Sequence, residues 1–250
     1  MKSAIPRKRV VLITGGSGGL GRALCQIFST AGDTVCAHFH RNKNACEKTI
    51  RALKKAGGES ALFSADLQDS KSVQRMMEKI LKRWEKVDLL INSAAITGDI
   101  LFSRMEEGEW DQVIGVNLSG VFFCMREAGR AMVEKGEGHI INISSYAAYT
   151  GRVGQASYTA SKRGLIALTQ SAAKEWGRSG VQVNAVLPGY LPTPMTASLP
   201  PVEKKRMIQE NTLDRPSTLE EVSRFIFDLS RMKHVSGQIF NLDSRILPFF

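Results

Sequence analysis

The sequence predicts an α/β fold, a single domain whose parallel β-sheet carries helices on both faces. Short apolar runs rich in β-branched residues alternate with longer segments of helical periodicity along almost the whole chain. Strands that alternate with helices in this way form βαβ units with right-handed crossovers. The 250 residues contain no linker-like tract and no internal repeat, so we expect one domain over residues 1–250.

In chain order, the predicted elements alternate between strand and helix. The apolar runs predicted as strands cover residues 10–13, 34–39, 61–64, 88–92, 139–144, 181–187 and 238–242. The segments of helical periodicity cover residues 20–31, 44–56, 70–84, 108–135, 156–178, 201–210 and 218–230. This order predicts a doubly wound sheet of about seven parallel strands flanked by helices.

The composition is that of a soluble globular protein. Hydrophobic residues make up 43% and charged residues 23% of the chain, which excludes a mainly disordered protein. No apolar run approaches the ~18 residues of a membrane span. The run at residues 10–13, which follows the basic Lys2, Arg7, Lys8 and Arg9, is too short for a secretory signal. We therefore expect a cytoplasmic protein with no membrane partner.

The chain is basic, with 34 Lys and Arg against 24 Asp and Glu and a net charge of +10. Such an excess attracts anions, including phosphorylated cofactors and acidic proteins. The basic residues stand in short, scattered groups without a nucleic-acid-binding motif. We interpret most of them as solvated helix faces and expect no nucleic-acid partner, while an acidic protein partner stays open.

Cysteines and histidines give no sign of a metal site. No pair of the four cysteines has CxxC spacing, and Cys25 and Cys36 lie in apolar stretches typical of buried free thiols. His38 and His40 share one face of a predicted strand, but no neighbouring carboxylate or cysteine completes a ligand set. We therefore expect no bound metal.

A glycine-rich turn joins the first predicted strand to the first predicted helix. Residues 14–21 read TGGSGGLG, with five glycines in seven residues. Such a turn lets the backbone approach a pyrophosphate, and the helix N-terminus offers free N–H groups and a positive dipole end. A simple tight turn does not require so many glycines, so the sequence predicts a dinucleotide site.

The ends of the second and third predicted strands bear on which dinucleotide binds. No acidic residue at positions 38–42 accepts from a ribose 2′-hydroxyl, and Arg41 stands where it can pair with a 2′-phosphate. Arg41 is equally interpretable as a solvated strand-end residue. Asp66 can accept from an adenine amino group or cap the next helix, a role for which Asp69 and Ser70 compete.

A tyrosine and a lysine are spaced for proton transfer. Tyr158 and Lys162 stand four residues apart in a predicted helix, so they share one face. A nearby ammonium stabilises a phenolate, and lowering the tyrosine pKa by ~3 units toward neutrality requires ~4 kcal/mol. Ser144 and Ser145 end the fifth predicted strand, at the sheet edge where ligands bind in this architecture.

These motifs, in this order, resemble the classical short-chain dehydrogenase/reductase family, a Rossmann-type fold, over residues 14 to about 242. Within it the chain is most similar to bacterial 3-oxoacyl-acyl-carrier-protein reductases, in the stretches at residues 98–105, 109–111 and 154–158. The resemblance implies catalytic roles for Asn117, Ser145, Tyr158 and Lys162. With the residues above, the predicted cofactor contacts are Gly15, Ser17, Gly19, Leu20, Gly21, Arg41, Asp66, Leu67, Asn92, Ala94, Tyr158, Lys162, Pro188, Gly189 and Thr193.

The activity that the resemblance implies is NADPH-dependent reduction of a ketone, most closely a 3-oxoacyl thioester on an acyl carrier protein. Tyr158 would donate the proton, Ser145 would polarise the carbonyl, Lys162 would depress the tyrosine pKa, and Asn117 would hold a water. Residues 190–212 are the expected substrate lid. A free small-molecule ketone or alcohol as substrate and a non-catalytic cofactor-binding scaffold are the alternatives.

Two surface predictions accompany this activity. Basic residues near the predicted site mouth would dock an acidic carrier protein: Arg104, Arg126, Arg130, Lys135 and Arg178. The docking arginines of the related reductases correspond to Gly136 and Ser179, each beside a basic residue. Surplus apolar residues on two long helices predict a homotetramer: Phe122, Phe123, Met125, Leu165, Ile166 and Leu168.

Three positions depart from the pattern of the related reductases. Residues 92–95 read Asn-Ser-Ala-Ala instead of Asn-Asn-Ala-Gly. The glycine turn lacks the basic residue that many NADPH-dependent members carry, and the chain reads Asn-Leu-Asp-Ser-Arg at 241–245 instead of Asp-Gly-Gly. The last departure leaves the C-terminal contacts and the exact substrate open.

Overall fold

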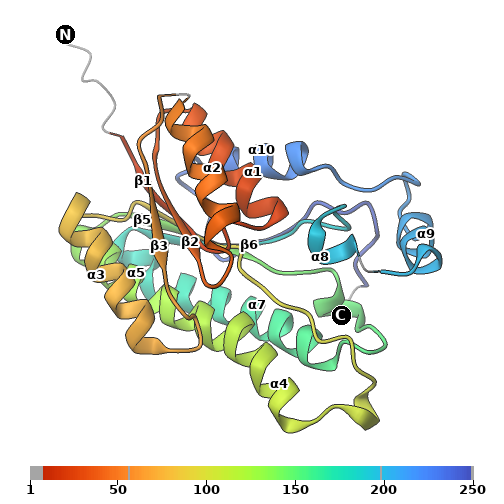
Figure 1. Ribbon diagram of the computed structural model, residues 1–250. Coiled ribbons are helices and arrows are strands. Elements are labelled where there is room, and N and C mark those ends of the chain that lie inside the picture. The colour runs from red at the N-terminus through yellow and green to blue at the C-terminus, as the bar shows by residue number, and fades with distance from the viewer. Residues whose placement is uncertain (1–7, 56, 198, 249–250) are drawn as a thin grey trace.

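A computed structural model describes residues 8–55, 57–197 and 199–248. Within them seven parallel strands form one sheet in the order β3-β2-β1-β4-β5-β6-β7 (Figure 1). The strands are β1 (Val10–Ile13), β2 (Thr34–Phe39), β3 (Ser60–Ser64), β4 (Leu89–Asn92), β5 (Gly138–Ile143), β6 (Val181–Leu187) and β7 (Ile239–Asn241). The predicted fold class, with its seven parallel strands, is confirmed.

Helices cover both faces of this sheet. They are α1 (Gly19–Thr30), α2 (Lys43–Lys55), α3 (Ser70–Trp84), α4 (Glu107–Ile114), α5 (Gly120–Lys135), α6 (Ala147–Thr150), α7 (Ala156–Trp176), α8 (Pro194–Ala197), α9 (Pro201–Gln209) and α10 (Leu219–Leu229). Short non-α turns are η1 (Phe102–Arg104), η2 (Gly115–Ser119) and η3 (Gly177–Ser179). None of the helices in the described residues is long and apolar enough to cross a membrane.

Two hydrophobic cores hold the layers together. On one face of the sheet α1, α2 and α10 pack through side chains such as Phe28, Ile50 and Ile226. On the other face α3, α5 and α7 pack through side chains such as Met76, Met132 and Leu165. Strands β1 and β2 are buried along their whole length, as expected of a parallel sheet covered on both sides.

The structure differs from the predicted elements at few places. The helix predicted over residues 108–135 is divided by the π-helical turn η2 into α4 and α5. The helices α6 and α8 were not predicted, since four residues give no periodic pattern. Ala56, the predicted end of the second helix, lies outside the described residues. All four cysteines are buried and free, as predicted for Cys25 and Cys36.

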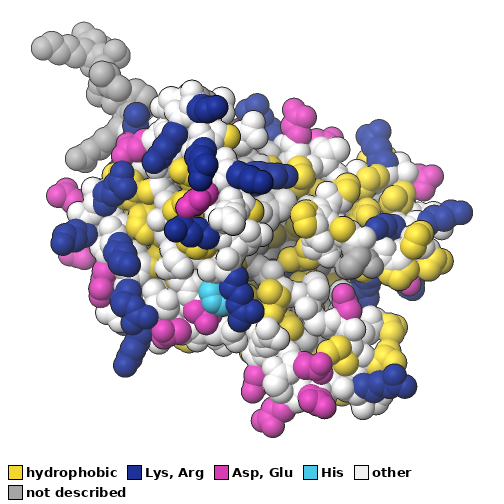
Figure 2. Space-filling model, in the orientation of Figure 1, with side chains coloured by type: hydrophobic (Ala, Val, Ile, Leu, Met, Phe, Trp, Pro, Cys, Tyr) yellow, Lys and Arg dark blue, Asp and Glu magenta, His cyan; other side chains and the backbone are white. Residues whose placement is uncertain are grey.

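The sheet order places a binding crevice between β1 and β4. There the chain reverses its direction of winding, and ligands bind outside the carboxyl ends of the strands at such a point. Helices α8 and α9 lie beside this edge, apart from the two helical layers (Figure 1). On the face shown in Figure 2, Lys and Arg side chains are dispersed, and hydrophobic side chains gather around α8 and α9.

Candidate active site

The glycine turn after β1 is shaped for close backbone contact. Gly15 has a left-handed φ of 71°, which glycine adopts without strain. A Cβ on Gly15 would lie 2.9 Å from the Cα of Ala94, and a Cβ on Gly21 would lie 2.1 Å from the Gly15 carbonyl oxygen. The turn therefore has room only for glycine at these two positions. Helix α1 begins within this glycine-rich segment, at Gly19, with no acidic residue in its first turn.

His38 fixes this turn from the neighbouring strand. The backbone N–H of Gly15 donates to His38 Nδ1 at 3.3 Å, and His38 Nε2 lies 3.0 Å from the Ala65 carbonyl oxygen. These contacts require the neutral tautomer with the proton on Nε2. Burial lowers the pKa of His38 to about 4, which keeps the ring neutral near pH 7. His38 thus has a structural role that the sequence alone did not suggest.

The ends of β2 and β3 form one end of a cavity of about 490 Å³ that Arg41 and Asp66 both line. Asp66 accepts from the backbone N–H of Gln68 at 3.0 Å and lies 3.8 Å from His40 Nε2. Asp69, whose carboxylate accepts from the Lys71 N–H at 2.9 Å, is the cap of α3. Of the three capping candidates, Asp69 is therefore the one that caps α3. Asp66 lines the cavity instead.

The segment after β4 forms the side of the same cavity. Ser93 and Ala94 donate their backbone N–H groups to Thr14 Oγ1 at 3.0 and 3.1 Å. The Asn92 side chain is buried and donates to Asn142 Oδ1 at 2.8 Å, so it lies within the sheet layer. Asn92 is not among the lining residues, unlike the other predicted cofactor contacts, every one of which lines the cavity.

Tyr158 and Lys162 project from α7 toward the sheet edge. The Lys162 Nζ atom lies 5.7 Å from the Tyr158 ring centroid and donates to the Ile143 carbonyl oxygen at 2.8 Å. Burial lowers the pKa of Lys162 to about 8. Burial also raises the pKa of Tyr158, and a hydrogen bond with the Ser145 side chain opposes this. The lowered tyrosine pKa expected from the motif is therefore not a property of the protein alone, because desolvation dominates.

Ser145 and Tyr158 also line a second cavity, of about 660 Å³, and Tyr158 borders both. Ser145 Oγ accepts from the Ala147 N–H at 3.2 Å. Residues 195–210 of the predicted lid contribute much of the lining, together with Tyr146, Arg152 and Arg245. Sequence reasoning missed these three residues, since no motif marks them.

Asn117 lies in the π-helical turn η2 and is fully buried. Its side chain accepts from the Ile96 N–H at 2.9 Å and donates to the Ile96 carbonyl at 2.8 Å and to Ser161 Oγ at 3.3 Å. These bonds hold the segment after β4 against α7. Insertions of this kind within α-helices are frequent at functional sites. The side chain contacts Ile96 and Ser161 rather than Lys162, so a water-holding role stays a prediction.

The first cavity fits a dinucleotide. The first turn of α1 borders it with backbone N–H groups, and the α1 N-cap, Gly18, has no side-chain cap. Lys162 borders it with a buried amine that has three donors when protonated and makes one hydrogen bond among the described residues. Phosphate oxygens and ribose hydroxyls are the acceptors that such donors recognise. Residues from the glycine turn to Thr193 would therefore hold the cofactor along one continuous surface.

The predicted position of two docking residues is wrong. Lys135 forms ion pairs of 2.6 Å with Asp88, which directly precedes β4, and with Glu137, which directly precedes β5. Arg178 lies in η3, just before β6. Since the strands are parallel, these residues lie at the amino edge of the sheet, opposite the candidate site of the same chain. Arg104, in η1 after β4, lies on the carboxyl side.

The fold, the glycine turn, and the Ser145, Tyr158 and Lys162 cluster define a dinucleotide-dependent oxidoreductase. A sequence profile described as short chain dehydrogenase matches residues 9–204. The chain belongs to this family of NAD(P)-dependent oxidoreductases.

Relatives and solved structures extend the likeness over most of the chain. It is 34% identical over 244 residues to a 3-oxoacyl-acyl-carrier-protein reductase of Synechocystis, covering 96% of this chain and 98% of that one. It is 35% identical over 234 residues to the corresponding Staphylococcus aureus reductase, covering 93% and 95%. A crystal structure of an actinorhodin polyketide ketoreductase variant with NADPH superposes with a TM-score of 0.87 at 27% identity, covering 94% and 95%.

Proposed function

We propose that this protein reduces a ketone to a secondary alcohol with NADPH, and that the ketone is a 3-oxoacyl thioester carried on an acyl carrier protein. The observation that carries the reaction type is the position of Tyr158, which borders both the cofactor cavity and the second cavity. A proton donor at this junction lies where a hydride acceptor in one cavity would meet a hydride donor in the other.

Bound NADPH supplies the hydride, and the residues of the chain place the ketone and supply the proton. Tyr158 donates its phenolic proton to the oxygen of the reduced carbonyl. Ser145, whose Oγ accepts from the Ala147 N–H and whose side chain hydrogen-bonds with Tyr158, would redirect its hydroxyl to that oxygen when a ketone binds. Lys162 holds the ribose and favours the phenolate that remains after proton transfer.

The cofactor preference rests on the end of β2. Residues 38–42 contain no carboxylate to accept from a ribose 2′-hydroxyl, and Arg41 lines the cavity there. A guanidinium pairs with a 2′-phosphate through its planar fork. The solved ketoreductase with NADPH supports the same choice.

The carrier-bound substrate rests on the relatives named above and on the net charge of +10. The positions of Lys135 and Arg178 at the amino edge of the sheet favour a second candidate, a free small-molecule ketone. The two substrates differ in their response to salt, because docking of an acidic carrier through surface charge is screened.

A kinetic experiment tests the reaction and separates the two substrates. Loss of NADPH absorbance with a short 3-oxoacyl thioester should show ketone reduction. NADPH binding without turnover of any ketone would instead indicate the non-catalytic scaffold. If carrier delivery is right, only the carrier-bound thioester should slow as salt rises, and Arg104→Glu, at the predicted docking residue that lies on the carboxyl side of the sheet, should raise its KM alone. Identical responses of carrier-bound and free thioesters would favour the free ketone.

We further propose a cytoplasmic homotetramer. Of the six apolar residues that suggested it, Met125, Leu165 and Ile166 are buried within the subunit, whereas Phe122 on α5 is 43% exposed. The Arg126 guanidinium lies 5.6 Å from the Phe122 ring centroid, a pairing suited to a polar-rimmed contact. Light scattering at micromolar concentration should give four subunits, and a monomer would contradict the proposal.

A further inference from the structure

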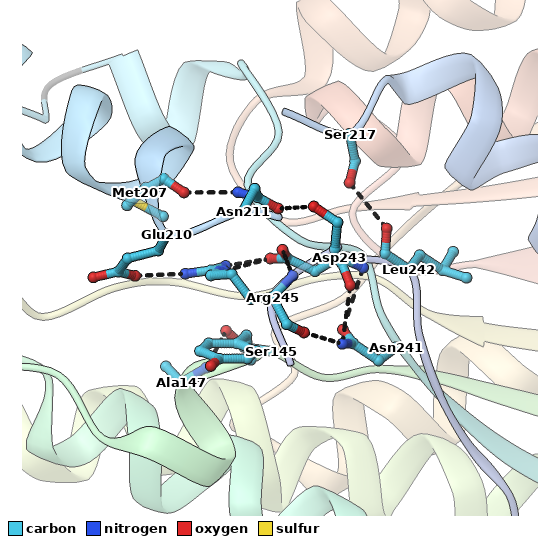
Figure 3. Close-up of polar contacts among 12 residues, drawn as sticks. Ser145, Ala147, Met207, Glu210, Asn211, Ser217, Asn241, Leu242, Asp243 and Arg245 are labelled. Carbon is cyan, nitrogen blue, oxygen red and sulfur yellow. Dashed lines mark hydrogen bonds and ion pairs between the residues drawn. The ribbon is translucent and has the colours of Figure 1, made fainter. Parts of the chain in front are cut away.

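The chain after β7 folds into a tight polar loop at residues 241–245 (Figure 3). The Asn241 side chain donates to the carbonyl oxygens of Asp243 and Arg245 at 3.0 and 2.9 Å and accepts from the Asp243 N–H at 3.2 Å. The loop also contacts the end of the predicted lid, residues 190–212, because Ser244 Oγ donates to Asn211 Oδ1 at 2.9 Å. Here the sequence departs from the Asp-Gly-Gly of the related reductases.

Arg245 is the side chain that this loop delivers to the substrate cavity. It is only 8% exposed, and its guanidinium donates to the Asp243 carboxylate through Nε at 2.8 Å and through Nη2. Nη1 donates to Glu210, the C-cap residue of α9, at 3.4 Å. The guanidinium carbon lies 4.1 Å from the ring centroid of Tyr146, the neighbour of Ser145. Three contacts from three segments thus fix the plane of the guanidinium.

Part of this fork remains available to a ligand. A guanidinium has five N–H donors, and Asp243 and Glu210 take three of them. Arg245 lines the cavity of about 660 Å³ that Ser145 and Tyr158 also line. A ketone whose carbonyl is held by Ser145 and Tyr158 therefore shares its cavity with a second, rigid set of donors.

The surrounding charge selects what those donors bind. The charged residues lining the cavity balance, three of each sign: Arg152, Arg206, Arg245, Asp99, Glu203 and Glu210. Asp243, bound directly to Arg245, adds one further negative charge. Although the whole chain has a net charge of +10, this cavity offers no excess positive charge to a substrate carboxylate. A neutral acceptor oxygen needs no excess positive charge, so it can accept a hydrogen bond from the guanidinium in this cavity.

We propose that Arg245 determines substrate specificity by donating a hydrogen bond to a second, uncharged carbonyl of the ketone substrate, such as that of an ester or thioester. This inference rests on the proposed reduction of a ketone and adds the residue that selects a neutral dicarbonyl over a simple ketone. The reacting carbonyl meets Ser145 and Tyr158, and the second carbonyl meets Arg245. Hydrogen bonds to charged groups contribute about 1.5–3 kcal/mol, which corresponds to roughly 10- to 100-fold in kcat/KM.

The test compares ethyl 3-oxobutanoate with heptan-2-one, which has the same chain length but lacks the second carbonyl. In Arg245→Met, kcat/KM for the oxoester should fall about 10- to 100-fold, while that for heptan-2-one should change by less than about threefold. Arg245→Lys, which keeps the charge but loses the fork, should show the same selective loss to a smaller degree.

Arg9 offers a matched control. It is also paired with a carboxylate, Asp33, at 2.7 Å, and it lies 5.6 Å from an aromatic centroid, that of Phe28, but it directly precedes β1 at the amino edge of the sheet. Arg9→Met should lower the melting temperature without changing the ratio of the two kcat/KM values. Equal loss of both activities in Arg245→Met, or loss of neither, would overturn the proposal.

A measurement on the unmodified protein makes the test independent of variant folding. Its kcat/KM for the anion 3-oxobutanoate should be at least about tenfold below that for the ethyl ester, because the cavity lacks excess positive charge. Equal or better use of the anion would overturn the inference while leaving ketone reduction intact. Failure to reduce any of the three ketones or the 3-oxoacyl thioester, free or carrier-bound, with NADPH binding retained, would overturn the proposed function and this inference together.

Discussion

The two cavities of this protein are built by different means. The cofactor cavity is formed by backbone turns at the ends of β1, β2, β3 and β4, each close in sequence to the strand that positions it. The substrate cavity is formed by side chains from α6, α7, α9 and the loop after β7, joined by contacts such as Arg245 with Glu210 across 35 positions. The shape of the cofactor cavity is thus determined by local backbone geometry. The shape of the substrate cavity depends on contacts between side chains that are distant in sequence.

Tyr158 lies where the two cavities meet, so replacing it should affect proton transfer without affecting NADPH binding. The expected loss of kcat is the largest effect among these predictions. Tyr158→Phe keeps the ring but removes the proton donor, and kcat should fall about 10²- to 10⁴-fold. The dissociation constant for NADPH should stay within about twofold, measured by the fluorescence of the bound cofactor. Tyr149→Phe on α6, outside both lining sets, is the control and should keep its activity. A Tyr158→Phe variant with more than a few per cent of the original kcat would remove Tyr158 from the acid role.

Lys162 tests whether burying a charged amine at the candidate active site lowers the free energy of unfolding. Burial lowers its pKa to about 8, whereas an unfolded lysine titrates near 10.4. Between these values the unfolded state binds more protons, so the contribution of Lys162 to stability rises with pH across this window. Below about pH 8 the buried charge has its full cost, on the order of 3 kcal/mol for a shift of this size.

Lys162→Met should therefore unfold at higher urea concentration than the original protein at pH 7, and the difference should shrink as the pH approaches 10. The same variant should lose activity at least about 100-fold, because it lacks the ammonium that favours the phenolate. A variant less stable than the original at pH 7 would show that the hydrogen bond to Ile143 outweighs the cost of burial.

The sequence predicted closely which residues line the first cavity, because the constraints on its backbone turns are steric and local. The position of Gly21, whose Cβ would meet the Gly15 carbonyl, follows from the turn alone. Asn92 shows the limit of such reasoning. It stands at the predicted place along β4, but it pairs with Asn142 in the β4–β5 register, and so its side chain lies in the sheet layer.

The substrate half escaped prediction for a physical reason. The position of Arg245 depends on its contacts with Glu210, Asp243 and the Tyr146 ring. No spacing of residues along the chain predicts that these four side chains lie together. Lys135 and Arg178 were assigned to the wrong edge because helix periodicity gives a residue's face but not its distance from the carboxyl ends of the strands. At η2, where the long predicted helix is divided, Asn117 contacts Ile96 and Ser161, and helical periodicity indicates neither partner.

Two glycine substitutions compare a position at which a Cβ would clash with the backbone with a position at which a Cβ has free space. Gly21→Ala places a methyl group against the backbone oxygen of Gly15. The turn must shift, and we expect NADPH affinity to fall about tenfold and stability to fall by about 1–3 kcal/mol. Gly108 lies in α4, and a methyl group there would have no neighbouring atom within 4 Å. Gly108→Ala should leave NADPH affinity unchanged and raise stability by about 0.5–1 kcal/mol. Equal effects of the two variants in urea titrations and NADPH binding would refute the steric argument.

Arg41 tests the one part of the first cavity at which a side chain, rather than the backbone, is expected to choose between the two cofactors. In the proposed binding mode the glycine turn, which has no basic residue, and the segment after β4 meet parts common to NADPH and NADH, and Arg41 at the end of β2 is the residue expected to distinguish them. Arg41 is exposed, and solvent weakens its pairing with a 2′-phosphate. We expect Arg41→Asp to raise the KM for NADPH about tenfold, since the carboxylate repels the phosphate, and to lower the KM for NADH by a smaller factor, since it accepts from the 2′-hydroxyl. Arg22→Asp on α1, outside the lining of the cavity, is the control for the change in net charge. Steady-state kinetics with both cofactors decide the matter: equal catalytic efficiency with NADPH and NADH in the original protein would refute the preference, and an equal response of the two variants would assign it to net charge rather than to Arg41.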